Sequence, residues 1–144
     1  MTLSADTGVE PVTQEIVELA TALVGRIWGH FTARAAELNL SIAEAKALSS
    51  LESDQALPMR ALAARLHANP SNVTVIVARL EARGLLEHQV SDDRRVKGVR
   101  LTASGFALRQ KLEVRLIADH PAVRGLSPAE RDALLRVLRR LIDK

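Results

Sequence analysis

Residues 60–101 read RALAARLHANPSNVTVIVARLEARGLLEHQVSDDRRVKGVRL, and this stretch decides the fold. Apolar residues recur at helical spacing over about 60–67 and again over about 70–83. Two residues predict where the second helix begins: Asn69 can cap it, and the proline that follows fits the first helical position. Gly84 predicts where this helix ends. Two helices joined by a turn this short indicate a helix-turn-helix.

The next residues predict a β-hairpin. Apolar and polar residues alternate over 86–90 and, more weakly, over 97–101. The connector 91–96 is polar and charged, as the tip of an exposed hairpin would be. A hairpin directly after a helix-turn-helix makes a winged helix.

The two sides of the predicted helix 70–83 differ in chemistry when successive residues are placed about 100° apart. One side is apolar and predicts the core contact: Val73, Ile76, Val77 and Leu80. The other side is small or polar, and we expect it to contact DNA: Ser71, Asn72, Thr74, Val75 and Arg79. Small side chains allow close approach to a groove, hydroxyls and amides can bond base edges, and valine can meet a thymine methyl. The alternative is a second buried face within a dimer.

The flanking regions predict further helices. A long amphipathic helix runs from about Thr13 to about Leu38, capping boxes begin helices at Ser41 and Ser127, and Thr102 caps another. The first and last helices carry apolar stripes wider than one contact needs, which favours a partner subunit. The predicted fold is mainly α with a small β-hairpin wing. It has a tail at 1–10, a dimerisation helix at 11–38, a DNA-binding lobe at 39–101 and dimerisation helices at 102–144.

Composition excludes several classes of protein. The 144 residues are 47% hydrophobic and 26% charged, with no cysteine, so thiolate metal sites and disulfides are excluded. No apolar run is long enough for a membrane span, and the first residues do not resemble a signal peptide, so we expect a cytoplasmic protein. Residues 60–100 carry eight bases and four acids, a net +4, whereas the rest of the chain carries −1. A basic excess here suggests a polyanionic partner, although a solvated charged surface is the alternative.

The motifs resemble those of MarR-type transcriptional regulators. The resemblance rests on Leu62-Ala63-Ala64-Arg65-Leu66, Ser71-Asn72-Val73-Thr74, Leu80-Glu81-Ala82-Arg83-Gly84-Leu85-Leu86, and Asp93-Arg94-Arg95 followed after five residues by Leu101-Thr102-Ala103-Ser104-Gly105. It covers about residues 12–144. Two departures occur: His67 stands where the family usually has glycine, and Pro58 precedes a helix that usually begins with a Ser or Thr cap.

The resemblance implies a homodimer that binds double-stranded DNA at a palindromic operator, acting as a repressor. It assigns Arg95 to the minor groove with Asp93 as its orienting partner, and the same wing carries the cations Arg94 and Lys97. The family often places its effector cleft near the positions of Trp28, His30 and Phe31. A small aromatic acid could bind these side chains, or they could simply pack in a core.

Other functions fit the sequence less well. Asp92 and Asp93 are adjacent on a hairpin, so their side chains diverge and form no acid–base pair. The four histidines lack metal-ligand spacing, and no glycine-rich phosphate loop occurs, so we predict no enzyme, no metal and no cofactor. A metal-responsive regulator and a winged helix that binds only proteins are the remaining alternatives.

Overall fold

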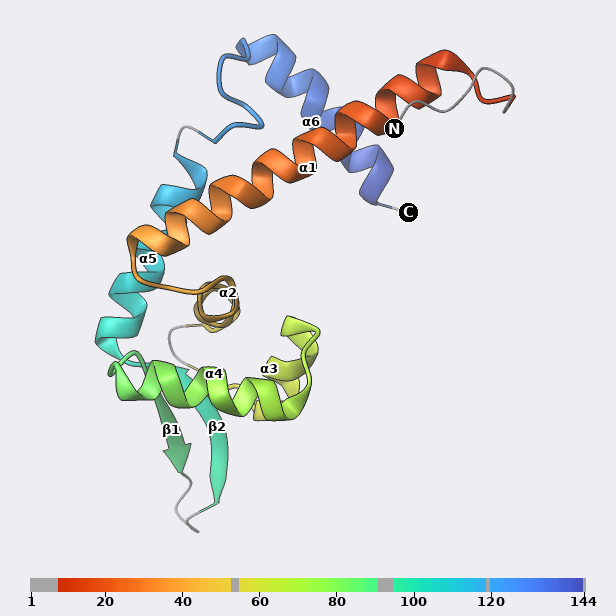
Figure 1. Ribbon diagram of the computed structural model, residues 1–144. Coiled ribbons are helices and arrows are strands. Elements are labelled where there is room, and N and C mark those ends of the chain that lie inside the picture. Colours follow the sequence, from red (N-terminus) through yellow and green to blue (C-terminus); the bar gives the residue numbers. More distant parts are fainter. Residues whose placement is uncertain (1–7, 53–54, 91–94, 119, 144) are drawn as a thin grey trace. The chain divides into compact units, whose positions relative to one another are not determined.

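The computed structural model describes residues 8–52, 55–90, 95–118 and 120–143. These residues form six helices and one antiparallel hairpin (Figure 1). The elements are α1 (Pro11–Glu37), α2 (Ile42–Ser49), α3 (Met59–Leu66), α4 (Pro70–Ala82), β1 (Leu86–Val90), β2 (Val96–Leu101), α5 (Ala103–Ile117) and α6 (Pro128–Ile142). The predicted fold class, mainly helical with a small hairpin, is confirmed.

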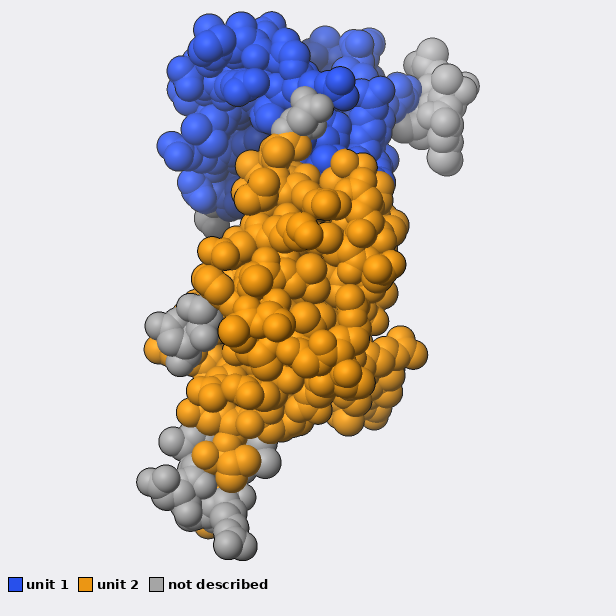
Figure 2. All heavy atoms as spheres, turned by 90° about the vertical axis from the view of Figure 1, so that its left-hand side faces the viewer, with its two compact units in different colours: residues 1–30, 119–144 blue, residues 31–118 orange. Residues whose placement is uncertain are grey.

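The chain divides into two compact units (Figure 2). Unit 1 comprises Met1–His30 and Asp119–Lys144, and unit 2 comprises Phe31–Ala118. Unit 2 therefore holds the end of α1 and all of α5 together with the winged helix, whereas unit 1 holds most of α1 and all of α6.

The core of unit 2 lies around α2, which packs against α3, α4 and α5. Its largest fully buried side chains are all leucine or valine, as the scarcity of aromatic residues requires. They are Leu48, Leu51, Leu62, Leu80, Leu112, Val73, Val77 and Val99. Each buried leucine contributes about 1.5–3 kcal/mol of transfer free energy, so this cluster fixes the helix-turn-helix in place.

The turn between α3 and α4 forms as the sequence predicts. His67 takes the left-handed conformation, with φ 49° and ψ 41°, in place of a glycine. Histidine is one of the few residues enriched there. The Asn69 side chain then accepts a hydrogen bond from the Ser71 backbone N–H at 2.8 Å, which caps α4. Gly84, with φ 70°, follows the end of α4. Pro58 precedes α3 without a side-chain cap.

The wing departs from simple alternation. Leu86 is buried, but Val90 at the other end of β1 is exposed, because the hairpin extends away from the helices (Figure 1) and a register shift interrupts it at Gln89 and Val90. Leu57 adds a short third pairing to β2 through two backbone hydrogen bonds with Val99, of 2.8 and 3.0 Å.

The two predicted capping boxes have different outcomes. At α6 the box is complete, because Glu130 accepts from the Ser127 N–H and the Ser127 hydroxyl accepts from the Glu130 N–H. At α2 the Ser41 hydroxyl accepts from the Glu44 N–H at 3.1 Å, but the Glu44 carboxylate lies 3.5 Å from Arg83. The predicted return bond of Glu44 to Ser41 is therefore replaced by a long-range ion pair.

Candidate nucleic-acid interface

The two sides of α4 are as different in the structure as in the sequence. Val73, Val77 and Leu80 are buried and Ile76 packs against the same core, so the predicted inner side is confirmed. The predicted outer residues, all exposed, are Ser71, Asn72, Thr74, Val75 and Arg79. Val75 lies at the middle of this surface and is 49% exposed. Exposure of its apolar side chain to water contributes no favourable free energy to folding.

The polar groups on the outer side of α4 remain available for a partner. Thr74 donates its hydroxyl to the Pro70 carbonyl at 3.0 Å and so keeps acceptor capacity. Within the described residues, the Arg79 guanidinium has no hydrogen-bond or ion-pair partner. The surface thus offers donors, acceptors and an exposed valine, which is the chemistry that base edges require.

The wing is described only in part. Arg95 is exposed just before β2, and Lys97 lies within β2, where its side chain is not described. Arg94 and the predicted orienting residue Asp93 lie outside the described residues. The pairing of Asp93 with Arg95 therefore stays a prediction.

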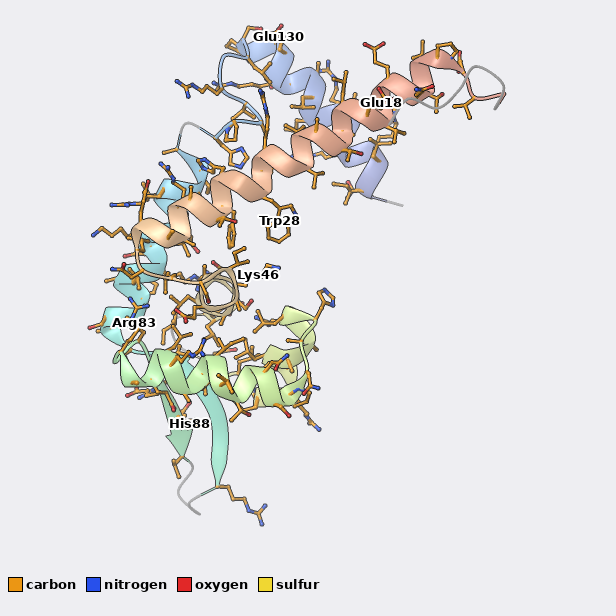
Figure 3. All side chains as sticks on the ribbon, viewed as in Figure 1. Glu18, Trp28, Lys46, Arg83, His88 and Glu130 are labelled. Atoms are coloured by element: carbon orange, nitrogen blue, oxygen red, sulfur yellow. The ribbon has the colours of Figure 1, made fainter. Side chains whose placement is uncertain are left out.

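Side-chain pairs join the wing to itself and to α4, and sequence reasoning missed them. The Glu81 carboxylate at the end of α4 contacts Nδ1 of His88 on β1 (Figure 3 labels His88). Across the hairpin, Arg100 donates to Glu87 at 2.7 Å. Opposite charges at matched positions of two alternating strands could have indicated the second pair, because directly opposed residues interact in an antiparallel hairpin.

Gly98 and Gly105 were also missed as positioning residues. A Cβ on Gly98 would lie 2.3 Å from the Leu57 carbonyl oxygen, and one on Gly105 would lie 1.9 Å from the Leu85 carbonyl oxygen. Gly98 therefore permits the segment before α3 to approach β2 closely, and Gly105 permits the start of α5 to approach the residue before β1. A glycine inside an alternating strand is the signal that could have identified Gly98.

The three predicted effector residues lie on α1 but belong to different units. Trp28 and His30 are in unit 1, where Trp28 is exposed and His30 is half-buried (Figure 3 labels Trp28). The His30 ring meets the His120 ring edge to face, with centroids 4.8 Å apart. Phe31 packs against the core of unit 2. A structural role thus accounts for Phe31, and the ligand role of the three stays a prediction.

The described residues also bear on two other features, a metal site and a membrane-spanning helix. Within the described ranges, no three His, Cys, Asp or Glu side chains gather as a metal site requires. In the same part of the chain, no helix combines the length and apolar character of a membrane span.

Comparisons with known proteins agree with this geometry. The family model described as MarR family matches residues 40–97. A MarR-family transcriptional regulator from Silicibacter pomeroyi is 29% identical over 86% of this chain and 85% of its own, with a TM-score of 0.64. CouR from Rhodococcus jostii RHA1, solved with p-coumaroyl-CoA, is 22% identical over 92% and 95%, with a TM-score of 0.68.

A point mutant of MepR from S. aureus, solved with an oligodeoxyribonucleotide, is 18% identical over 89% of this chain and 96% of its own, with a TM-score of 0.66. At 18% and 22% identity these structures support the fold alone. No curated protein matches the sequence. The family match spans the helix-turn-helix and the start of β2, and the Silicibacter pomeroyi structure shares the fold over most of the chain. Residues 40–97 therefore match the MarR family, and the chain shares the winged-helix fold of a solved MarR-family transcriptional regulator.

Proposed function

We propose that the protein is a sequence-specific repressor that binds palindromic double-stranded DNA as a homodimer. The outer side of α4 carries this proposal. It is exposed, free of acidic residues at its centre, and built from Ser71, Asn72, Thr74, Val75 and Arg79. A helix side selected only for solubility would carry lysine or glutamate instead. The second helix of a helix-turn-helix is also the one that enters the major groove.

The wing supplies the second proposed contact. Arg94, Arg95 and Lys97 are close together in the sequence of the connector and the start of β2, directly after the acids Asp92 and Asp93. We assign Arg95 to the minor groove with Asp93 as its orienting partner, and Arg94 and Lys97 to phosphate. Narrow minor grooves have enhanced negative potential that attracts arginine.

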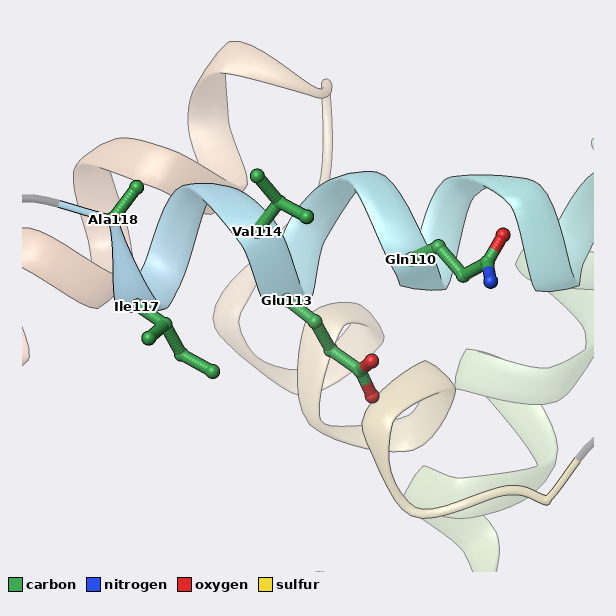
Figure 4. Close-up of a pocket in the computed structure, with 5 residues that line it drawn as sticks. All are labelled: Gln110, Glu113, Val114, Ile117 and Ala118. Atoms are coloured by element: carbon green, nitrogen blue, oxygen red, sulfur yellow. The ribbon is translucent and has the colours of Figure 1, made fainter.

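Exposed apolar side chains support the dimer. In unit 1, α1 exposes Ile16 and Leu19, and α6 exposes Leu138 and Ile142, the last at 76%. In unit 2, α5 exposes Val114 and Ile117 beside a shallow hollow of about 500 Å³ (Figure 4). Apolar surface of this extent normally marks an interface. We propose that a second copy of the chain covers it, because a palindrome needs two recognition helices related by a dyad.

An effector is proposed to release the DNA. CouR, which shares the fold, was solved with p-coumaroyl-CoA, an aromatic acyl thioester. In this chain Trp28 and His30 offer an aromatic surface and a titratable nitrogen in unit 1. We propose a small aromatic acid as the class of ligand. Because the proposed partner is DNA, we also propose a cytoplasmic location.

The salt dependence of duplex binding tests the proposed class of partner. Fluorescence anisotropy with a labelled duplex should show that log K falls linearly with log salt concentration, because bound cations release counterions from phosphates. The matched probe is the same strand without its complement. The chain has one tryptophan, two phenylalanines and no tyrosine, too few rings for single-strand stacking, so the duplex should bind more tightly. A winged helix that binds only proteins would bind neither the duplex nor the single strand with this dependence on salt.

A further inference from the structure

The Arg83 side chain lies where α4 meets the connection between α1 and α2. Arg83 is the C-cap residue of α4. Its Nη1 donates to the Asn39 carbonyl at 2.8 Å, and its Nη2 donates to the Leu38 carbonyl at 3.3 Å. Nη1 also lies 3.5 Å from the Glu44 carboxylate at the start of α2. All four residues belong to unit 2.

The two carbonyls that Arg83 contacts need a donor. Leu38 and Asn39 follow the last residue of α1, where helix carbonyls have no intrahelical partner. The chain reverses there, with Asn39 at φ 56°, and Leu38 is buried, so water has limited access. The C-terminal end of a helix also carries partial negative charge, which favours a cation. The guanidinium therefore satisfies both carbonyls and is balanced by Glu44.

Other contacts of α4 are less directional. Val73, Val77 and Leu80 hold α4 to the core through apolar burial, which depends on area and little on angle. A guanidinium instead bonds in a rigid planar fork, so two bonded carbonyls define where its end of the helix lies. The recognition side chains Val75 and Arg79 are on the same rigid helix, one to two turns before Arg83.

We infer that Arg83 is a positioning residue for DNA recognition, which fixes the C-terminal end of α4 against the end of α1 and the start of α2. This inference rests on the proposed function of α4. Arg83 acts through the placement of Val75 and Arg79 and not by contacting phosphate, because its donors are directed at the protein's own carbonyls. Base-edge contacts depend on geometry, whereas phosphate contacts tolerate small displacements.

The variant Arg83→Lys separates position from charge. Lysine keeps the positive charge but is a point donor that cannot reproduce the fork. We expect roughly tenfold weaker binding to an operator duplex selected by the wild type, the size typical of coupling through a packed contact. Binding to a scrambled duplex, and the slope of log K against log salt, should stay at wild-type values. In Arg83→Gln, which removes the charge as well, the operator loss should be at least as large with the same salt slope.

The control is Arg109→Gln. Arg109 also donates to a backbone carbonyl, that of Leu51, and pairs with Glu113, but it lies on α5. The Arg109→Gln protein should be less stable than the wild type but should keep its preference for the operator duplex over the scrambled duplex. If Arg109→Gln lowers that preference as much as Arg83→Lys, or if Arg83→Lys binds operator like the wild type, the inference is wrong. A flatter salt slope for Arg83→Gln would also overturn it, since it would show a phosphate contact.

Hydrogen exchange without DNA keeps this inference separate from the proposed function. We expect faster amide exchange in the last turn of α4 in Arg83→Lys than in the wild type or in Arg109→Gln. Unchanged exchange there would overturn the positioning role whatever the protein binds. A wild-type protein that prefers no duplex would instead refute the proposed function, and it would show no loss specific to Arg83.

Discussion

Replacing Gly105 by alanine should destabilise the fold through one backbone contact. An added Cβ would lie 1.9 Å from the Leu85 carbonyl oxygen and 2.9 Å from its carbonyl carbon. Real Cβ atoms essentially never come closer than 3.0 Å to such atoms, so the two segments must separate by about 1 Å. The Leu85 carbonyl also accepts the Thr102 N–H at 3.1 Å, and this bond would be strained by the same movement.

The magnitude follows from two costs and one gain. Overpacking costs about 1–3 kcal/mol, and weakening a buried backbone hydrogen bond costs a further 1–3 kcal/mol. Alanine regains about 1 kcal/mol of helix propensity over glycine at this position in α5. The expected loss is therefore about 3 kcal/mol, a large part of the 5–15 kcal/mol that stabilises a typical domain.

Urea denaturation followed by circular dichroism measures this loss. The matched control is Ser104→Ala, an exposed residue in the same turn of α5, which should change the unfolding free energy by about 0.5 kcal/mol or less. Because DNA is absent from the assay, the result depends only on the fold. A Gly105→Ala protein as stable as Ser104→Ala would refute the close approach of α5 to Leu85.

Four further outcomes are expected. Val75→Ala should lower affinity by about 1 kcal/mol for duplexes with a thymine at the contacted position and little for others, as measured by anisotropy on base-substituted duplexes. Arg95→Ala should leave the fold intact by circular dichroism but lower operator affinity and flatten the slope of log K against log salt by about one per lost contact, or two per dimer. Leu138→Glu places a charge on the exposed apolar side of α6 and should shift light scattering from dimer to monomer. Hydrogen bonds from Ser127, first from its backbone N–H and then from its side chain, lower the pKa of Glu130. The Glu130 carboxylate therefore contributes to stability above the unfolded-state pKa, and this contribution is lost as pH falls through the folded-state pKa. The difference in unfolding free energy between the wild type and Glu130→Gln should accordingly shrink on acidification.

Local patterns were sufficient to predict most of the fold. The periodicity of 70–83 placed Val73, Val77 and Leu80 inside because a helix repeats every 3.6 residues. The left-handed turn at His67 and the positive φ of Gly84 just after α4 followed from the conformations that these residues tolerate. Each of these features depends on residues within one or two turns of each other.

Features that depend on distant residues could not be predicted. The Arg83 guanidinium reaches carbonyls more than 40 positions earlier in the chain, and this contact draws Glu44 away from the predicted capping box. The Leu57 pairing with Val99 and the contact between Glu81 and His88 likewise join separate elements. Such contacts leave no periodic signal in the sequence, because nothing local requires them.

The exposure of the outer side of α4 followed from its helical periodicity, whereas its contact with DNA stays a prediction. The predicted effector residues were less well defined, because neighbours on one helix point in different directions and no pattern says what each will meet. Phe31 meets the core of unit 2, whereas the His30 ring meets His120.

Selection of bound sequences from random duplex DNA tests the central claim most directly. If two copies of α4 read DNA about a dyad, the enriched sequences should contain an inverted repeat whose half-sites lie about 10 to 10.5 base pairs apart, centre to centre. Selection with the Val75→Ala protein should enrich a motif that differs from the wild-type motif at one symmetric pair of positions. The absence of any enriched motif, or a motif without two-fold symmetry, would contradict the account.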